Sequence, residues 1–247
     1  MHAPVLALLL ALQPTPEPPA APEPQPDFAT LVEEEEDALL AFTYGWPKAA
    51  AAVPAVERRM KADMAASRTR ARKYARDDKA ERPASATYIA HYFAKTWAML
   101  GDTPHLLSLS ASIESFTGGA HGNVNFDGLI WDKAAGRAVT LADLFADPAA
   151  AFAALTPAYC HTLDQERSER RGEPLPLAGE TTVADCPPLP KQVALPVDAD
   201  SDGRFEALMI LLGPYAAGAY AEGSYALEVP VTAPLRALVK DRHRASF

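Results

Sequence analysis

The chain has 247 residues, an apolar fraction of 49% and a formal net charge of −9. This length allows one large domain or two small ones with a sizeable core, and the acidic charge disfavours nucleic acid as a partner. The longest apolar run, residues 3–12, is too short to cross a bilayer, which needs about 20 residues.

The first 26 residues resemble an export segment followed by a linker. Residues 1–12 match the apolar region of a secretory signal, although no Lys or Arg precedes it. Residues 13–26 are rich in Pro, Glu and Ala, so they cannot bury apolar surface and are expected to be extended. We therefore expect a periplasmic or secreted protein, with no stable membrane span once the signal is removed.

The next segment predicts a strand and then a long helix. The acidic residues 28–41 fit either a short helix or a strand, whereas 42–47 alternate aromatic side chains as a strand does. An apolar stripe then predicts a helix from Pro54 to about Lys79. Its members are Val56, Met60, Met64, Ala71 and Tyr74. The many Lys and Arg residues of this helix indicate either contact with an anionic surface or an outer face that complements acidic neighbours.

Two hairpin strands and a third strand follow. Residues 88–100 are rich in aromatics and predict a strand, with a helix as the rival, and 106–116 and 123–131 predict two further strands. Between the last two lies the sequence Gly-Gly-Ala-His-Gly, from Gly118 to Gly122. Glycine supplies backbone angles that other residues resist, so this segment predicts a specified loop.

The second half alternates helix and strand. Residues 148–171 are helical in composition, and Pro157 must start a second helix or kink the first. Residues 173–190 are a Pro-rich irregular crossing. Three strands and a short helix are then predicted, at 192–197, 205–212, 224–231 and 233–240. The fold class is α+β, a mainly antiparallel sheet with two principal helices packed on it.

The chain has two cysteines, Cys160 and Cys186. In an exported protein they predict a disulfide that closes a loop of about 25 residues, and in a cytosolic protein two buried thiols. His161 adjoins Cys160 without forming a zinc motif, so we expect no zinc site and no cofactor.

An Asp-rich turn leaves calcium binding undecided from sequence. Asp198, Asp200 and Asp202 alternate ahead of Gly203 as at the start of a calcium loop, but Met209 stands where the bidentate glutamate belongs. An Asp-Gly turn between two strands explains the same residues, and we assign no metal.

Two loops carry candidate functional residues. His121 has Glu114 and Asp127 nearby, which supplies the side chains for acid–base chemistry, but the interpretation we favour is a histidine that braces its own loop. In the loop 213–223, Tyr215 and Tyr220 are amphipathic side chains typical of interfaces, unless they pack on the sheet.

Taken together, these features resemble a bacterial extracytoplasmic domain of uncharacterised function. It forms the ectodomain of the lysozyme-sensing anti-sigma factor RsiV and accompanies some peptidoglycan deacetylases. The matching residues are Phe116, 118–121 (Gly-Gly-Ala-His), 140–145 (Thr-Leu-Ala-Asp-Leu-Phe) and 214–220 (Pro-Tyr-Ala-Ala-Gly-Ala-Tyr). The strand 42–47 and the helix after Pro54 are similar to an N-terminal companion domain of that family.

The resemblance implies a companion subdomain at 27–105, a Gly-Gly-Ala-His domain at 106–247 and a non-enzymatic binding or sensing role. A lysozyme-like protein or peptidoglycan is then the expected partner, and lysozymes are typically basic, opposite in sign to this chain. The implied contact residues are Pro214, Tyr215, Tyr220, Gly118, Gly119 and His121. The alternative is a cell-wall-directed hydrolase that uses His121 with Asp127 or Glu114. The transmembrane helix of the anti-sigma members and the catalytic metal-binding set of the deacetylases find no counterpart in this sequence.

Overall fold

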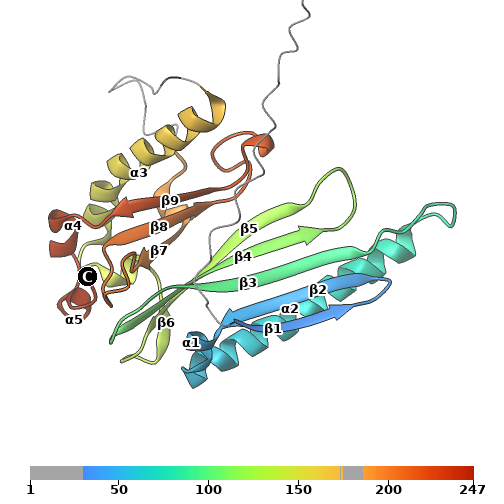
Figure 1. The fold of residues 1–247 in the computed structure, drawn as a ribbon, viewed down its shortest axis with the longest axis horizontal. Helices are drawn as coiled ribbons and strands as arrows, with labels where there is room; N and C mark the ends of the chain where they lie inside the picture. The colour runs from blue at the N-terminus through green and yellow to red at the C-terminus, as the bar shows by residue number, and fades with distance from the viewer. Residues whose placement is uncertain (1–29, 173, 175–185) are drawn as a thin grey trace, which may run out of the picture.

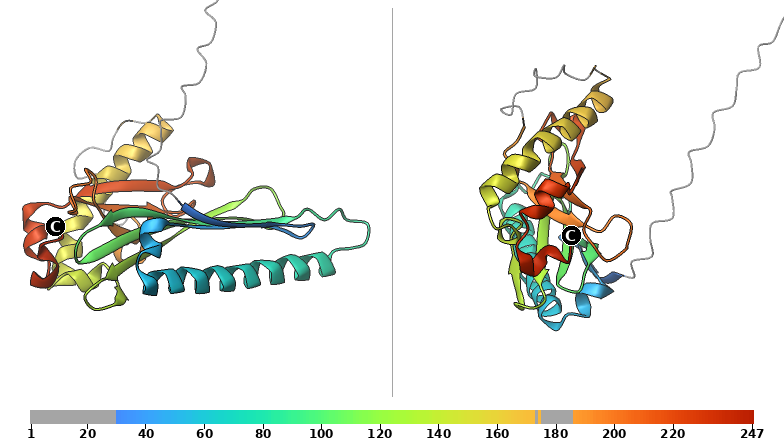
Figure 2. Two further views of the ribbon diagram at one scale, coloured as in Figure 1. Left: turned by 60° about the horizontal axis from the view of Figure 1, so that its bottom comes forward. Right: turned by 90° about the vertical axis from the view of Figure 1, so that its left-hand side faces the viewer.

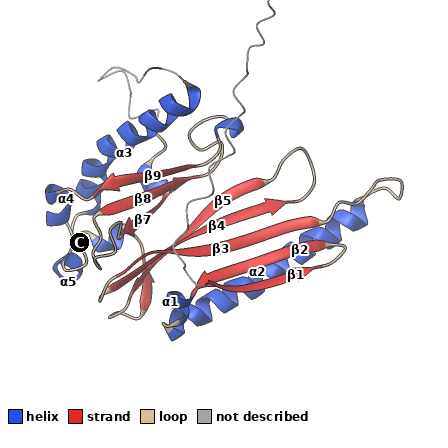
Figure 3. Cartoon of the chain, in the orientation of Figure 1, coloured by secondary structure: helices blue, strands red, loops and turns tan. Residues whose placement is uncertain are grey.

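The computed structural model describes residues 30–172, 174 and 186–247 (Figure 1). The signal-like segment 1–12, the linker 13–26 and most of the crossing 173–190 lie outside the described residues. The described part combines two β-sheets with helices, most of them short and two of them long (Figure 3). This confirms the α+β class predicted from the sequence.

The larger sheet has six strands in the spatial order in which they occur along the chain. They are β1 (Thr30–Glu36), β2 (Leu40–Pro47), β3 (His91–Asp102), β4 (Leu106–Phe116), β5 (Asn123–Asp132) and β6 (Arg137–Val139). All neighbours are antiparallel except β2 and β3, which run parallel. A parallel pair needs a crossover connection, and here α1 (Lys48–Ala51) and α2 (Pro54–Glu81) provide it.

The acidic N-terminal segment forms a strand, which resolves the alternatives that its sequence left open. β1 pairs antiparallel with β2 at the sheet edge, and Glu35 of β1 contacts Arg68 and Arg72 of α2. The Arg72 guanidinium also lies 2.9 Å from the carboxylate of Asp37. The basic helix therefore complements acidic neighbours within its own chain.

α2 covers one face of the larger sheet (Figure 2). Its buried residues Val56 and Met60 pack on β2 and β3 in one hydrophobic cluster. The sheet contributes chiefly Leu40, Phe42, Tyr44, Trp46, Trp97, Leu107 and Leu109. Tyr74, assigned to the apolar stripe from sequence, is instead 65% exposed, and it lines a cavity between α2 and the sheet.

The smaller sheet consists of the three strands predicted near the C-terminus. They are β7 (Val193–Val197), β8 (Ala207–Leu212) and β9 (Tyr225–Pro230), all antiparallel. α3 (Pro148–Arg171) packs on this sheet, and its buried Leu155, Tyr159 and Leu163 share a core with β8 and β9. α3 continues through Pro157, so a second helix does not begin there. The predicted helix 233–240 ends earlier, as α4 (Ala233–Ala237), and a second short helix, α5 (Asp241–Arg244), forms in the segment after it.

The two sheets meet where β7 approaches β5. A Cβ on Gly128 would come within 2.9 Å of the Leu195 side chain, so glycine permits this close contact. The amide of Asp198 also donates to the carbonyl of Leu100 at 2.9 Å. The predicted limits at residues 105 and 106 fall between β3 and β4, which pair with each other, and these limits stay a prediction.

Candidate functional site

The two loops singled out from the sequence lie together in the structure. The His121 ring, in the β4–β5 loop, stacks on the Tyr220 ring, in the β8–β9 loop, with centroids 3.8 Å apart. The Tyr220 hydroxyl donates to the carbonyl of Gly122 at 2.8 Å, across 98 residues of sequence. The loops 117–122 and 213–224 therefore form one surface, which we call the tyrosine-loop surface.

Glycines allow both loops to take these paths. Gly118 and Gly119 have φ angles of 93° and 101°, a region that side-chain-bearing residues rarely adopt. A Cβ on Gly213 would lie 3.2 Å from the carbonyl of Val124, so the second loop runs close against β5. The glycine pattern that drew attention in the sequence thus has a structural cause.

Tyr215 projects from this surface. Its side chain is 65% exposed, and its ring centroid lies 5.5 Å from that of Tyr220. Its φ of 68° is unusual for a residue other than glycine, and such backbone strain persists only where the surroundings hold it. Pro214, which precedes Tyr215, is half-buried. The loop therefore presents one aromatic ring outward beside a second that is fixed.

Side chains at the C-terminal end of α3 hydrogen-bond to the loop 213–224. Arg170 donates to the carbonyls of Glu222 and Ser224 at 2.6 and 2.7 Å, and Arg167 donates to the carbonyl of Ala217 at 2.9 Å. The Glu222 carboxylate accepts from the Tyr225 hydroxyl at 2.5 Å and from Arg171 at 2.9 Å. The Tyr225 hydrogen bond, followed by those from Arg171 and the Ala219 amide, lowers the pKa of Glu222 to about 2. These charge-assisted bonds make the loop a pre-formed element.

The pair that a hydrolase would need is not formed. Within the described residues no hydrogen bond or ion pair joins His121 to Glu114 or Asp127; His121 Nδ1 lies 2.9 Å from the carbonyl of Gly122. Asp127 lies four residues into β5, so roughly 13 Å of strand separates it from the end of the loop that carries His121. The Asp127 carboxylate instead binds Lys95 at 2.8 Å. His121 therefore fits the role of a loop brace.

The Asp-rich segment forms the turn between β7 and β8. Carboxylate oxygens of Asp198, Asp200, Asp202 and Glu206 lie within 4.8 Å of one another. Backbone amides of Asp202 and Gly203 donate to Asp198, as expected of an Asp-Gly turn.

Cys160 and Cys186 form the predicted disulfide, with Cα atoms 5.7 Å apart. It joins α3 to the segment that precedes β7, where the Tyr159 hydroxyl also donates to the carbonyl of Pro187 at 3.1 Å. Disulfides persist in oxidising compartments, so the bond indicates an extracytoplasmic protein. None of the helices in the described part of the chain combines the length and apolar character that a membrane span needs.

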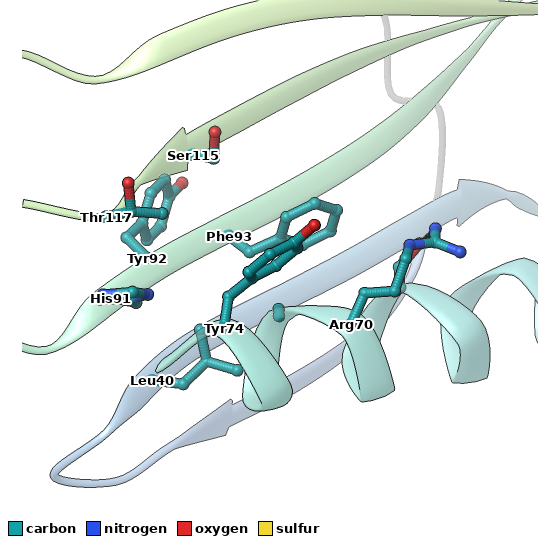
Figure 4. Close-up of a pocket in the computed structure, with 10 residues that line it drawn as sticks. Leu40, Arg70, Tyr74, His91, Tyr92, Phe93, Ser115 and Thr117 are labelled. Atoms are coloured by element: carbon teal, nitrogen blue, oxygen red, sulfur yellow. Dashed lines mark hydrogen bonds between the residues drawn. The ribbon is translucent and has the colours of Figure 1, made fainter. Parts of the chain in front are cut away.

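A cavity under α2 is the feature that sequence reasoning missed. It has a volume of about 240 Å³ and lies between α2 and the ends of β2, β3 and β4 (Figure 4). Ser67, Arg70, Ala71 and Tyr74 face it from α2, at the i, i+3, i+4, i+7 spacing of one helix face. The sequence held one signal of this cavity: Ser67 and Arg70 stand on this face of α2 at positions where a helix packed on a sheet would carry apolar side chains.

The chain is similar to a known protein family over part of its length and to solved structures of bacterial proteins. Residues 33–124 match a protein-family model described as "Deacetylase PdaC". A crystal structure of a DUF3298 family member from Bacteroides fragilis NCTC 9343 is 14% identical, with a TM-score of 0.52, covering 88% of this chain and 95% of that one. A DUF3298 family protein from Pseudomonas aeruginosa PAO1 is also 14% identical, with a TM-score of 0.48, covering 86% and 93%.

No curated protein sequence matches this chain. The family match covers less than half of the chain, and the Bacteroides likeness concerns the fold. Together they support a relationship with bacterial extracytoplasmic domains whose function is uncharacterised.

Proposed function

We propose that this protein is a non-enzymatic binding or sensing module of the cell envelope, periplasmic or secreted, which holds its partner on the tyrosine-loop surface. The observation that carries the proposal is the stacking of His121 on Tyr220 beside the exposed ring of Tyr215. Two loops far apart in sequence thereby present one aromatic surface.

The pre-formed state of this surface favours binding. Ordering a flexible loop on association costs free energy, whereas a loop already fixed by Arg167, Arg170 and Arg171 avoids most of that cost. Tyrosine adds a large amphipathic contact area with few side-chain rotations to freeze, which is why it is common in binding surfaces.

The partner we propose is a lysozyme-like protein, with peptidoglycan as the other candidate. The resemblance to the RsiV ectodomain points to the first, and the net charge of −9 has the sign that favours a basic protein. The comparison with the "Deacetylase PdaC" family supports an envelope setting for either candidate.

The test is a calorimetric titration of the full-length chain with hen lysozyme and, separately, with soluble peptidoglycan fragments. If Tyr215 anchors the partner, Tyr215→Ala should weaken lysozyme binding by about 2 kcal/mol, roughly thirtyfold. Tyr74→Ala is the matched control, because Tyr74 is equally exposed but lies on α2, at the opposite face of the larger sheet.

Each outcome decides a part of this proposal. Loss of lysozyme binding in Tyr215→Ala with unchanged binding in Tyr74→Ala supports it. If the native chain binds the peptidoglycan fragments and does not bind lysozyme, the partner is peptidoglycan and not a lysozyme-like protein. If the native chain binds neither probe while its near-ultraviolet circular dichroism shows an intact fold, the proposal fails.

A further inference from the structure

The cavity under α2 is mainly apolar, and its lining carries one permanent charge, that of Arg70. Figure 4 shows Arg70 at one end of the cavity and His91 at the other, with the rings of Tyr74 and Phe93 between them. Leu40 adds an aliphatic side chain to the lining. The volume of about 240 Å³ is below the usual range for drug-sized ligands, so the space suits a molecule built on a single ring.

Arg70 has no carboxylate partner among the described residues. Its one hydrogen bond there is donated to the Ser67 hydroxyl at 3.1 Å. Asp63, which lies nearly two turns earlier on α2, is already bound by Lys95 at 2.8 Å and by Tyr44 at 2.6 Å. A guanidinium can bind a carboxylate through two parallel N–H bonds, and Arg70 keeps that capacity unused at the edge of an apolar space.

Ser67 supplies a second donor at the same end of the cavity. Thr69, on the same helix, donates its hydroxyl proton to the carbonyl of Ala65 at 2.9 Å, as helical hydroxyls commonly do. Ser67 is only 2% exposed and accepts from Arg70, but in the part of the chain that the structure describes no acceptor lies within hydrogen-bond distance of its hydroxyl. A buried donor left unpaired is costly. Two adjacent donors favour a ligand group that only accepts, which is a carboxylate.

The neighbouring acidic hollow gives the ligand an orientation. This hollow of about 520 Å³ shares His91 with the cavity and is lined by three carboxylates, those of Asp77, Asp78 and Glu81. Asp78 lies eight residues after Arg70 on α2, about 12 Å along the helix axis. A carboxylate is therefore repelled at the His91 end and attracted at the Arg70 end.

We propose that this cavity binds a small monocarboxylic acid with one apolar ring, whose carboxylate accepts from Arg70 and from the Ser67 hydroxyl. The ring of the acid lies against Tyr74 and Phe93, which offer it aromatic contacts. The inference does not rest on the proposed function, because partner binding is assigned there to Tyr215 and its loop.

The experiment is an NMR titration of the ¹⁵N-labelled full-length chain with three molecules of similar shape and different charge: phenylacetate, phenylacetamide and phenethylamine. We expect phenylacetate to shift the amides of residues 67–74, 91–93 and 115–117. It should bind about tenfold more tightly than the neutral amide, because the amide cannot form the charge-assisted bonds with Arg70. The cationic amine should bind most weakly.

Three variants separate the charge from the apolar wall. Arg70→Met removes the charge and keeps an unbranched side chain, so phenylacetate and phenylacetamide should then bind equally. Arg76→Met is the matched control, because Arg76 is an exposed arginine of α2 that does not line the cavity, and it should keep the preference for the acid. Tyr74→Ala should weaken binding of the acid and of the amide alike. The urea midpoint of each variant checks that it still folds.

The proposal is overturned if the native chain binds phenylacetate and phenylacetamide equally, since the cavity would then select only apolar character. Loss of the preference in Arg76→Met as well as in Arg70→Met would also overturn it, because the attraction would belong to the basic helix as a whole. The absence of shifts at about 50 mM phenylacetate would do the same. Tighter binding of N-acetylphenylalanine than of phenylacetate would support the carboxyl end of a peptide as the source of the ligand, and the reverse order would support a free acid.

Discussion

Lys95 shows at the residue scale how a charge is kept inside this fold. The side chain is almost fully buried, and its ammonium lies 2.8 Å from both the Asp63 and the Asp127 carboxylates. Asp63 also accepts from the Tyr44 hydroxyl at 2.6 Å, and Trp97 donates to that hydroxyl at 2.9 Å. Partial burial opposes ionisation of Asp63, but the hydrogen bonds from Lys95 and Tyr44 outweigh it and lower its pKa. Burial, followed by the bond to Asp63, raises the pKa of Tyr44.

We predict that Lys95→Met destabilises the protein by about 2 kcal/mol. Removing one partner of a buried ion pair leaves the carboxylates uncompensated, although their partial exposure reduces the penalty. Asp127→Asn is the control and should cost less than about 1 kcal/mol, because the Asp127 side chain is 48% exposed and Asp63 still pairs with Lys95. Urea denaturation measures both. Equal losses in the two variants would contradict this account.

At the scale of elements, the C-terminal end of α3 is joined to the loop 213–224 by the hydrogen bonds of Arg167, Arg170 and Arg171, which we call the α3 clamp. The strength of this clamp should depend on pH through Glu222. Its pKa is about 2 in the folded protein, below the ordinary value of 4.5. A depressed carboxyl pKa contributes stability that is present above the unfolded pKa and is lost as pH falls through the folded one. The clamp should therefore hold above about pH 4.5 and weaken between there and pH 2.

Glu222→Gln tests this dependence because it keeps the shape of the side chain and removes the charge. The stability difference between the native chain and the variant, measured by urea denaturation, should be largest near pH 6 and shrink as the pH falls from 4.5 toward 2. At pH 6 the amides of residues 213–223 should exchange hydrogen faster in the variant. A stability difference that stays constant with pH would show that the charge of Glu222 does not hold the loop.

For the whole molecule, local sequence patterns predicted the helices and strands better than they predicted which elements pair or pack with one another. Residues 42–47 alternate and α2 repeats every three or four residues, so both could be assigned from sequence. The acidic strand β1 could not, because its stability comes from pairing with β2 and from Arg68 and Arg72, not from its own propensity. The parallel pairing of β2 with β3 likewise depends on the path of α2.

The candidate functional surfaces also combine features that the sequence predicts with contacts that only the folded structure shows. The glycines and tyrosines of both loops were visible in the sequence, but the contact of His121 with Tyr220 is a tertiary fact. The cavity was missed because its polar member His91 comes from a strand and Tyr74 from a helix, with no motif to relate them. Tyr74 also fitted an apolar stripe, so its exposure could not be foreseen from periodicity.

The disulfide links α3 to the segment that precedes β7, so its reduction should lower the stability of the whole fold. Cys160 and Cys186 are 26 residues apart, and closing a loop of that size stabilises by about 3 kcal/mol in the entropy model. Dithiothreitol should therefore lower the free energy of unfolding of the native chain by that amount and raise its urea m-value, because the reduced unfolded chain exposes more surface. In the Cys160→Ala/Cys186→Ala variant the reductant should change nothing. A native chain unaffected by reduction would show that the crosslink does not contribute.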